Sequence, residues 1–382
     1  MELLFHLSDR FIQNGIMDFT IEITQQCNFR CNYCCFSGEY NQMRFHSDRY
    51  ISQETIQKSI EFIKKSAHKK EHIVVSFYGG ESLLGLNSIL FIMNELYDFF
   101  GERISFDLST NGYLLTPKTV DKLLKYDVGI SVSLDGCKII HDKNRRTIND
   151  LPTFDVVVSN LISFKRNHPE EYRKRIRLLI TSGSLSDIKI MNEYYSDLKE
   201  LIGEKPIFIS RIYPNFNKGL IYDDNISDMI DFYESAIERK KRGISDLYTL
   251  LLDNLLKKTK KKFLCNENSN HINLKTCLDC QQRAFIDIDG NISPCEKFDS
   301  KHFIGSVRSG IDIKLLKKIS YRYYFRRSFL CSECEIVEYC SRCLADLKMT
   351  FAEQKRMCDI YKKNVKIAIL INKKLSSYAS NN

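Results

Sequence analysis

Short β-branched runs alternate with longer amphipathic segments from residue 17 to about residue 245, and few folds accommodate such a pattern. The segments between the runs carry apolar residues at helical spacing, as at Ile56, Ile60 and Ile63. The expected strands are DFTIEIT, HIVVSFYGG, RISFDLSTN, DVGISVSLD, RIRLLITS and PIFISRIY. Six successive strand and helix units predict an α/β fold with a parallel sheet and an exterior of helices.

The number of units limits the shape of the sheet. Six are too few for a closed eight-stranded barrel, so we expect either a partial (β/α)6 barrel or a doubly wound sheet. In both architectures the chemistry takes place at the carboxyl ends of the strands. The first four strands are followed by CNFRCNYC, GGE, TNG and LDG. These four motifs are therefore predicted to share one rim of the sheet.

A change in composition follows the lysine-rich stretch KKTKKKF. Nine of the 14 cysteines lie between Cys265 and Cys358, where the alternation has ended. This part has no large apolar core of its own, so bound metal is expected to stabilise it. The predicted organisation is a barrel domain over 1–245, a basic connector over 246–264, a cysteine-rich domain over 265–358, and a closing helix and tail over 359–382.

The cysteine content also bears on the compartment. Fourteen cysteines without a secretion signal argue against a disulfide framework, because reduced thiols at clustered spacings more often serve metal binding or catalysis. No apolar run reaches the ~20 residues that are needed to cross a bilayer. We therefore expect a cytoplasmic protein without a membrane partner.

The first cysteine cluster has the spacing C-x3-C-x2-C and consists of Cys27, Cys31 and Cys34. A structural zinc site normally takes four protein ligands, so three cysteines leave one coordination position open. On a cubane iron-sulfur cluster, three thiolates leave the fourth iron free to bind a small molecule. Two further thiols, Cys35 and Cys137, are interpreted as buried or incidental.

The stretch CNFRCNYC resembles the signature of the radical S-adenosylmethionine (SAM) enzymes. The resemblance implies that the three cysteines hold a 4Fe-4S cluster whose fourth iron binds the amino and carboxylate groups of SAM. In that family, an electron from a flavodoxin- or ferredoxin-type donor cleaves SAM to methionine and a 5′-deoxyadenosyl radical. That radical then abstracts a hydrogen from the substrate.

Three further motifs, YGGESLL, STNGYLL and SVSLDG, resemble family stretches around the methionine moiety and the ribose of SAM. The glycines of the first motif are expected to let the backbone approach the methionine amino group. The stretch HDKNRR offers Arg145 or Arg146 as a partner for the methionine carboxylate. The cofactor-binding residues that the resemblance implies are Tyr33, Gly79, Gly80, Glu81, Asn111, Ser133 and Arg145.

The cysteines of the C-terminal part closely resemble the SPASM extension of radical enzymes that act on peptides and proteins. The resemblance implies two auxiliary 4Fe-4S clusters, whereas a zinc ribbon is the alternative for this segment alone. One cluster would use Cys277, Cys295, Cys343 and either Cys265, which we prefer, or Cys280. The other would use Cys331, Cys334, Cys340 and Cys358. The spacing before Cys343 is x2 where the family has x3, which leaves its ligation open.

Three clusters would change the charge of the chain. The formal charge is +9 with all cysteines neutral, and eleven thiolates on three clusters would lower it by five charges to about +4. Much of the basic excess would then offset the clusters, so a nucleic-acid partner is not expected.

The SPASM resemblance implies a polypeptide substrate. We expect a peptide maturase that abstracts a hydrogen from a ribosomally made precursor peptide and installs a thioether or carbon-carbon crosslink. An anaerobic sulfatase maturase that forms formylglycine is the alternative, and those enzymes carry a catalytic aspartate where this chain has Glu296. A non-catalytic metal-binding protein is the third hypothesis. Only 26 residues precede Cys27, so we expect a separate protein or the enzyme's own surface, not a winged-helix domain, to recognise any leader peptide.

Overall fold

The computed structural model describes residues 15–40, 43–67, 70–203, 207–211, 224–259, 283–298, 300–340 and 349–379. Its centre is one sheet of ten strands in the order β10-β9-β8-β7-β1-β2-β3-β4-β5-β6. Strands β1 to β6 pair in parallel in their sequence order, which confirms the six predicted strands. Their bounds are Asp18–Thr24, Ile73–Gly79, Ile104–Thr110, Val128–Ser133, Ile176–Ser182 and Ile207–Arg211.

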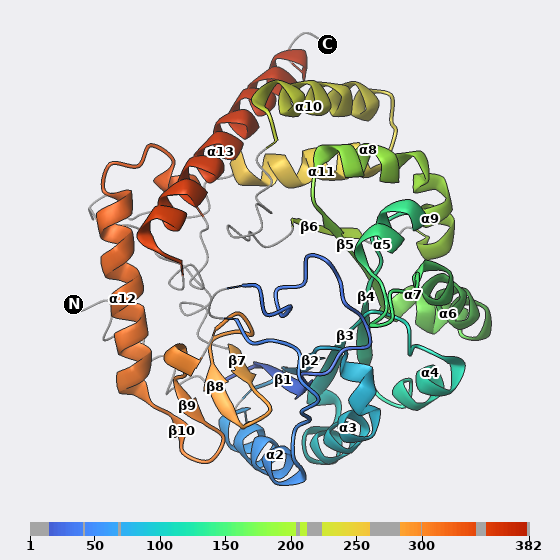
Figure 1. The fold of residues 1–382 in the computed structure, drawn as a ribbon, viewed down its shortest axis with the longest axis vertical. Helices are drawn as coiled ribbons and strands as arrows, with labels where there is room; N and C mark the ends of the chain where they lie inside the picture. The colour runs from blue at the N-terminus through green and yellow to red at the C-terminus, as the bar shows by residue number, and fades with distance from the viewer. Residues whose placement is uncertain are drawn as a thin grey trace.

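Helices cover the outer face of this curved sheet, as Figure 1 shows for α2, α3, α4 and α6. Among the described residues the strand order ends at β6 and β10, so that part of the chain forms an open sheet. The predicted partial barrel is therefore confirmed. The helices of this part are α2 Gln53–Ala67, α3 Leu86–Phe100, α4 Pro117–Leu123, α5 Lys138–Asn144, α6 Phe154–Asn167, α7 Pro169–Arg175, α8 Leu185–Glu193 and α9 Tyr195–Ile202, with short 3-10 turns at Ser82–Gly85 and Gly101–Arg103.

Local sequence signals explain where these helices begin and which side they bury. The Thr116 side chain accepts a hydrogen bond from the Thr119 N–H, and Pro117 occupies the first helical position of α4. Ile56, Ile60 and Ile63 of α2 are buried against the sheet, as their spacing predicts.

One helical stretch in the described residues, Ser82–Arg103, is long and apolar enough to cross a membrane by length and composition. The sequence analysis did not expect such a stretch. In the structure, α3 lies within it and buries Ile89, Ile92 and Met93 in the main core. The helix is therefore part of the barrel wall. Its length and apolar composition are also typical of a helix that is buried in a protein core.

The C-terminal part continues the barrel sheet. Strand β7 (Arg283–Ile286) pairs in parallel with β1, and β8 (Asn291–Ser293) returns antiparallel to β7. The turn between them contains Gly290 at φ +83°, a conformation that favours glycine. The stretch RAFIDIDGNISPC thus forms a strand, a tight turn and a returning strand. The sheet ends with β9 (Gly305–Ser306) and β10 (Gly310–Ile311).

Four helices complete the described fold: α10 (Ile226–Lys241), α11 (Leu247–Leu256), α12 (Ile313–Cys331) and α13 (Phe351–Ala379), with 3-10 turns at Lys257–Thr259, Ser300–His302 and Val337–Tyr339. Helix α13 packs on α10 and α11, and Figure 1 shows it running beside both. The structure has a helix in the predicted C-terminal segment, but this helix begins at Phe351, before the predicted boundary at 359, and includes Cys358.

Candidate active site

A cavity of about 310 Å³ opens at the carboxyl ends of the barrel strands. Residues that follow β1, β2, β3 and β4 line it, so the four motifs do share one rim. Of the residues that the sequence analysis singled out for the first cluster and its cofactor, all ten line this cavity: Cys27, Cys31, Tyr33, Cys34, Gly79, Gly80, Glu81, Asn111, Ser133 and Arg145. Their roles as ligands stay predictions.

The loop after β1 presents the three cysteines to the cavity. Cys27 is buried, whereas Cys31 and Cys34 are partly exposed. Burial raises the pKa of both Cys27 and Cys31 to about 12, so these thiols are neutral unless a positive centre binds them. No group of three His, Cys, Asp or Glu side chains in the described part of the chain is arranged to hold a single metal ion.

His46 lies beside the third cysteine. Its Nε2 atom is 3.5 Å from the Cys34 sulfur, and burial lowers the pKa of His46 to about 4. The imidazole is therefore neutral near pH 7. Sequence reasoning missed this residue, because a single histidine in a loop carries no spacing signal.

The two glycines of GGE pack against the first loop. A Cβ atom on Gly79 would lie 2.3 Å from the Thr24 carbonyl oxygen, and one on Gly80 would lie 2.1 Å from the Gln26 carbonyl oxygen. The Gly80 N–H also donates to the Thr24 carbonyl at 2.8 Å. The missing side chains thus let the end of β2 approach the strand and loop that carry Cys27, which is a packing reason for both glycines.

Glu81 joins the ends of two strands. One carboxylate oxygen accepts from the Thr110 hydroxyl at 2.7 Å and from the Leu83 N–H at 3.0 Å. The other accepts from the Asn111 N–H at 2.7 Å. With three donors around it, the buried carboxylate holds the TNG motif in place.

Arg145 and Tyr33 converge on a buried aspartate. Oδ2 of Asp135 accepts hydrogen bonds from the Tyr33 hydroxyl and from Nε of Arg145, the latter at 2.9 Å. Burial is the largest single influence and disfavours the charge on Arg145, but the interactions with Asp135, Tyr33 and Cys31 together outweigh it and raise the pKa of Arg145. Asp135 lies in the LDG motif, but the sequence analysis assigned it no role.

The structure distinguishes the two candidate arginines. Arg145 lines the cavity beside Cys31. Arg146 instead pairs with Asp150 at the surface and donates to the Asp142 carbonyl at 3.1 Å. Of the pair, only Arg145 lines the cavity.

Comparison with known proteins identifies the barrel. Residues 21–190 match the Radical SAM superfamily. The chain contains a radical SAM domain. Two curated relatives extend the similarity beyond that domain. The radical SAM cyclopropyl synthase TigE of Paramaledivibacter caminithermalis is 24% identical over 381 residues, covering 93% of this chain and 74% of TigE. A cysteine-type anaerobic sulfatase-maturating enzyme of Clostridium perfringens is 23% identical over 355 residues, covering 88% of this chain and 91% of that enzyme.

Solved structures share the fold. The structure described as native anSMEcpe with bound AdoMet has a TM-score of 0.69 and 22% identity, and the match covers 96% of this chain and 99% of the other. Native anSMEcpe with bound AdoMet and Cp18Cys peptide gives a TM-score of 0.67 and 20% identity over 96% of this chain and 100% of the other. The radical SAM barrel and the C-terminal part therefore have the architecture of those enzymes.

A hydrogen-bond chain behind the radical SAM cavity depends on a neutral histidine. The Asp135 N–H donates to Nδ1 of His141 at 3.2 Å, and Nε2 of His141 lies 3.1 Å from the Thr153 hydroxyl. That hydroxyl donates to the Arg145 carbonyl at 2.6 Å. Because Nδ1 accepts, the proton of the neutral ring must be on Nε2. Protonation of Nδ1 would place its N–H next to the Asp135 N–H, so the hydrogen bond between the two residues would be lost.

The hydrogen bonds of His141 predict that the stability of the protein depends on pH. Burial lowers the pKa of His141 to about 4, so the unfolded chain binds the proton first as the pH falls. His141 therefore contributes to the free energy of unfolding at pH values above its ordinary pKa. This contribution, at most about 3 kcal/mol, is lost as the pH falls toward 4. Denaturant titrations of the protein and of His141→Gln at roughly pH 7.5 and pH 5 measure this contribution to the free energy of unfolding. The variant should be less stable at the higher pH but lose less on acidification; an equal loss in both proteins would contradict the assignment.

Glu296 lies beside the radical SAM cavity but does not line it. Its side chain is 19% exposed and its Oε2 is 3.8 Å from the Arg283 guanidinium. That oxygen is buried and has no hydrogen-bond partner in the described part of the chain. Burial is the main cause that raises the pKa of Tyr78, and the charges of Cys35 and Glu296 add to it. Glu296 therefore interacts electrostatically with two residues that line the cavity, Tyr78 and Cys35.

The predicted auxiliary ligands fall into two groups. Cys265, Cys277, Cys280 and Cys343 lie outside the described residues, and Cys295 is buried after β8. The second set is fully described. Cys331 is the last residue of α12 and interacts electrostatically with Cys340 and Cys358. The Cys334 N–H donates to the Cys331 carbonyl at 3.1 Å. The four cysteines predicted for one cluster are Cys331, Cys334, Cys340 and Cys358.

Replacing Cys334 with alanine should remove about one cluster of iron per chain and lower the stability of the C-terminal part. The physical reason is that ligation by this set would join Cys331 at the end of α12 to Cys358 within α13. Iron and sulfide analysis after anaerobic reconstitution, followed by thermal unfolding, measures both effects. Unchanged iron content would remove Cys334 from the ligand set.

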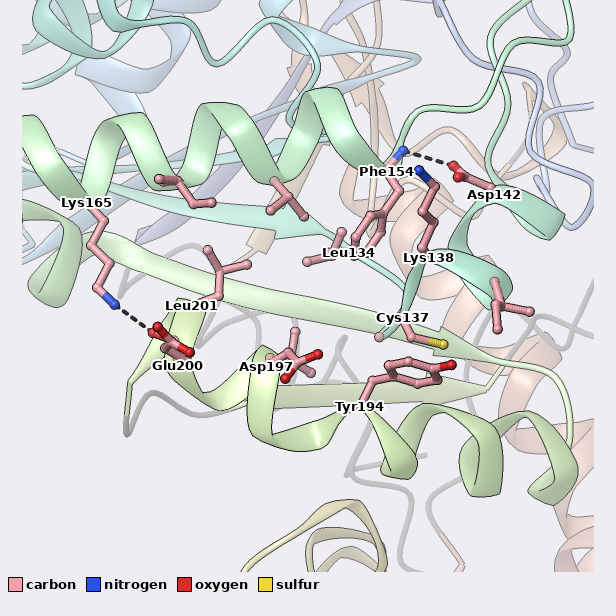
Figure 2. Close-up of a pocket in the computed structure, with 15 residues that line it drawn as sticks. Leu134, Cys137, Lys138, Asp142, Phe154, Lys165, Tyr194, Asp197, Glu200 and Leu201 are labelled. Atoms are coloured by element: carbon pink, nitrogen blue, oxygen red, sulfur yellow. Dashed lines mark hydrogen bonds between the residues drawn. The ribbon is translucent and has the colours of Figure 1, made fainter.

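A second pocket lies on the outside of the barrel. Its volume is about 900 Å³. Figure 2 shows that it lies between α5, α6 and α9, with Leu134, Phe154 and Leu201 in its wall. Lys165 donates to the Glu200 carbonyl at one end. Cys137 lines the pocket and is 3% exposed, which confirms its interpretation as a buried thiol. The other extra thiol, Cys35, lines the radical SAM cavity, and burial raises its pKa to about 12.

Proposed function

We propose that this chain is a radical SAM peptide maturase that abstracts a hydrogen from a ribosomally made precursor peptide and installs a thioether or carbon-carbon crosslink. The observation that carries the proposal is the convergence of three cysteines, the GGE motif and Arg145 on one cavity at the strand ends of a radical SAM domain. Chemistry at the carboxyl ends of parallel strands is the general rule for this architecture.

The lining of the cavity fits a 4Fe-4S cluster and SAM. Three thiols share one space with a cation, Arg145, and with the polar side chains of Asn111 and Ser133. The high pKa of the thiols means that they need a positive centre such as iron to become thiolates. When bound, the cluster and SAM supply the electron and the 5′-deoxyadenosyl radical that takes the substrate hydrogen.

The protein residues then hold the cofactor and substrate in position. Asp135 orients Arg145 toward the cavity, where its charge would bind the methionine carboxylate. Asn111 and Ser133 would bind the carboxylate or the ribose. Tyr33, which donates to Asp135, closes the wall between the cysteine loop and β4. These contacts would bring the radical and the substrate into reacting distance and exclude water.

One observation supports carbon-carbon bond formation, and two support a polypeptide substrate. TigE is named as a cyclopropyl synthase, and such a product requires a new carbon-carbon bond. The anSMEcpe structure with the Cp18Cys peptide shows a peptide bound to a protein of this fold. In this chain β6 has no partner strand on its outer edge among the described residues, and Ser210 of β6 lines the cavity. An extended peptide could add to that edge.

Further partners belong to the same proposal. A flavodoxin- or ferredoxin-type protein would donate the electron, a separate leader-binding protein could deliver the precursor, and the cytoplasm would keep the cysteine thiols reduced. The two auxiliary clusters would accept the electron that remains after hydrogen abstraction, or bind the substrate.

The test begins with anaerobic reconstitution by iron and sulfide. We expect about twelve irons per chain, since each of three clusters holds four. Reduction with SAM should then yield 5′-deoxyadenosine. Co-expression with a short peptide encoded beside the gene should give a peptide that has lost two hydrogen atoms and resists aldehyde reagents. Zinc in place of iron, with no cleavage of SAM, would refute the proposal and favour a metal-binding protein without catalysis.

Formation of formylglycine is the second candidate. The similarity to the sulfatase-maturating enzyme covers 88% of this chain, and Glu296 directly follows Cys295 in the position of those enzymes' catalytic aspartate. The Cp18Cys peptide and its serine analogue are suitable probes. A product that reacts with a hydrazide would favour this function, because formylglycine is an aldehyde.

A further inference from the structure

A buried arginine lies inside the predicted auxiliary cluster site. Arg327 of α12 is 7% exposed, and its Nη1 donates to the Tyr323 hydroxyl at 3.0 Å. Nε and Nη2 are buried and have no oxygen or nitrogen partner for a hydrogen bond in the described part of the chain, where the Cys331 thiol is the neighbouring acceptor. No ion pair within the described ranges joins this guanidinium to an aspartate or glutamate. Burying a cation in this way is strongly unfavourable unless an anionic group lies beside it.

The neighbours of the guanidinium are predicted cluster ligands. Cys331 follows Arg327 by four residues on α12, so both side chains lie on one helix face. The electrostatic interactions of Arg327 include Cys340 and Cys331, in addition to Tyr323. In turn, Cys331 interacts with Cys340 and Cys358. The cation therefore interacts electrostatically with Cys331 and Cys340, and no ion pair in the described residues joins it to a carboxylate.

Four thiolates on a 4Fe-4S core would supply the missing negative charge. The net charge of the oxidised cluster with its four thiolates is about −2, and reduction by one electron changes it to about −3. A buried cation stabilises the more negative state more, because the attraction between charges is weakly screened there. The two unpartnered N–H donors of Arg327 would also find sulfur acceptors.

We infer that Arg327 is a positioning and tuning residue for the auxiliary cluster held by Cys331, Cys334, Cys340 and Cys358, and that it raises the reduction potential of this cluster. This inference rests on the proposed function, in which that cluster receives an electron after hydrogen abstraction. The one-electron reduction needs no proton from the arginine, which stays charged in both states.

The experiment is a redox titration of the reconstituted full chain, followed by electron paramagnetic resonance, with dithionite as reductant and ferricyanide as oxidant. The background variant Cys31→Ala removes the first cluster from the spectrum. Arg327→Met removes the charge and keeps the length, Arg327→Lys keeps the charge, and Arg322→Met removes an exposed charge from the same helix.

We expect Arg327→Met to lower the midpoint potential of one auxiliary cluster, Arg327→Lys to restore most of it, and Arg322→Met to leave it unchanged. If Arg327→Met binds about one cluster less iron while the other two variants load fully, the inference is also supported. Full loading with an unchanged potential in Arg327→Met overturns it. Iron analysis of the unsubstituted chain distinguishes failure of this inference from failure of the proposed function. If the unsubstituted chain lacks the auxiliary cluster, both fail; if it holds the cluster and Arg327→Met leaves the potential unchanged, only the inference about Arg327 fails.

Discussion

Replacement of Cys31 by alanine is expected to abolish formation of 5′-deoxyadenosine and to leave the fold intact. Cys31 lies in the loop after β1, is only partly buried, and lines the cavity. Two remaining thiols cannot hold the cubane with one open iron, so no electron would reach SAM. Loss of the sulfur removes little packing, at about 1 kcal/mol or less. Chromatography of a reduced reaction with SAM measures the first effect, and circular dichroism with thermal unfolding measures the second.

The neighbouring thiol offers a matched control. Cys35 lines the same cavity but lies outside the C-x3-C-x2-C spacing, so Cys35→Ser should keep the first cluster and a substantial rate of SAM cleavage. Loss of cleavage in both variants would mean that any change in the loop disrupts the site. Unfolding of Cys31→Ala would contradict the separation of catalytic from structural cysteines.

Replacement of Gly80 by alanine should reduce SAM cleavage by about 10²-fold through a change in position alone. The new Cβ atom would lie 2.1 Å from the Gln26 carbonyl oxygen, 2.5 Å from the Gln26 carbonyl carbon and 3.0 Å from the Cys27 nitrogen. All three are backbone atoms, so the loop that carries Cys27 must move. Overpacking of this kind costs about 1–3 kcal/mol in stability. Iron content, SAM cleavage and thermal unfolding are measured together.

A second glycine controls for the substitution itself. A Cβ atom on Gly129 of β4 would approach only the ends of the Asp107 and Arg177 side chains, which are partly exposed and can move aside. Gly129→Ala should therefore keep the cluster and most of the activity. Equal activity in Gly80→Ala and the unsubstituted chain would show that the loop after β1 adjusts freely, contrary to the close backbone packing in the structure.

Much of the site was predictable because its signals are local. The cysteine spacing, the GGE motif and the TNG motif each lie within a few residues, directly after a strand. Parallel strands bring their carboxyl ends to one edge, so motifs from separate units meet there without any long-range information. The fold class followed from the same alternation of strands and helices.

Other residues of the site carry no local signal. Tyr33 and Arg145 meet at Asp135, and the hydrogen bond from Tyr33 joins residues 102 positions apart. His141 supports Asp135 only because α5 turns back on the end of β4. In sequence alone, Arg145 and Arg146 are adjacent and equivalent, whereas in the structure one faces the cavity and the other pairs with Asp150.

The sequence by itself determined the order of the strands and helices, the open position of the first cysteine cluster and the rim on which the chemistry would lie. Each of these depends on periodicity or spacing within a short segment. Only the tertiary structure decided that β7 extends the barrel sheet beside β1, that backbone carbonyls fill the space next to the GGE glycines, and that Arg327 is buried beside thiols. These depend on packing and hydrogen bonds between distant segments, and such contacts are set when the whole chain closes around its core.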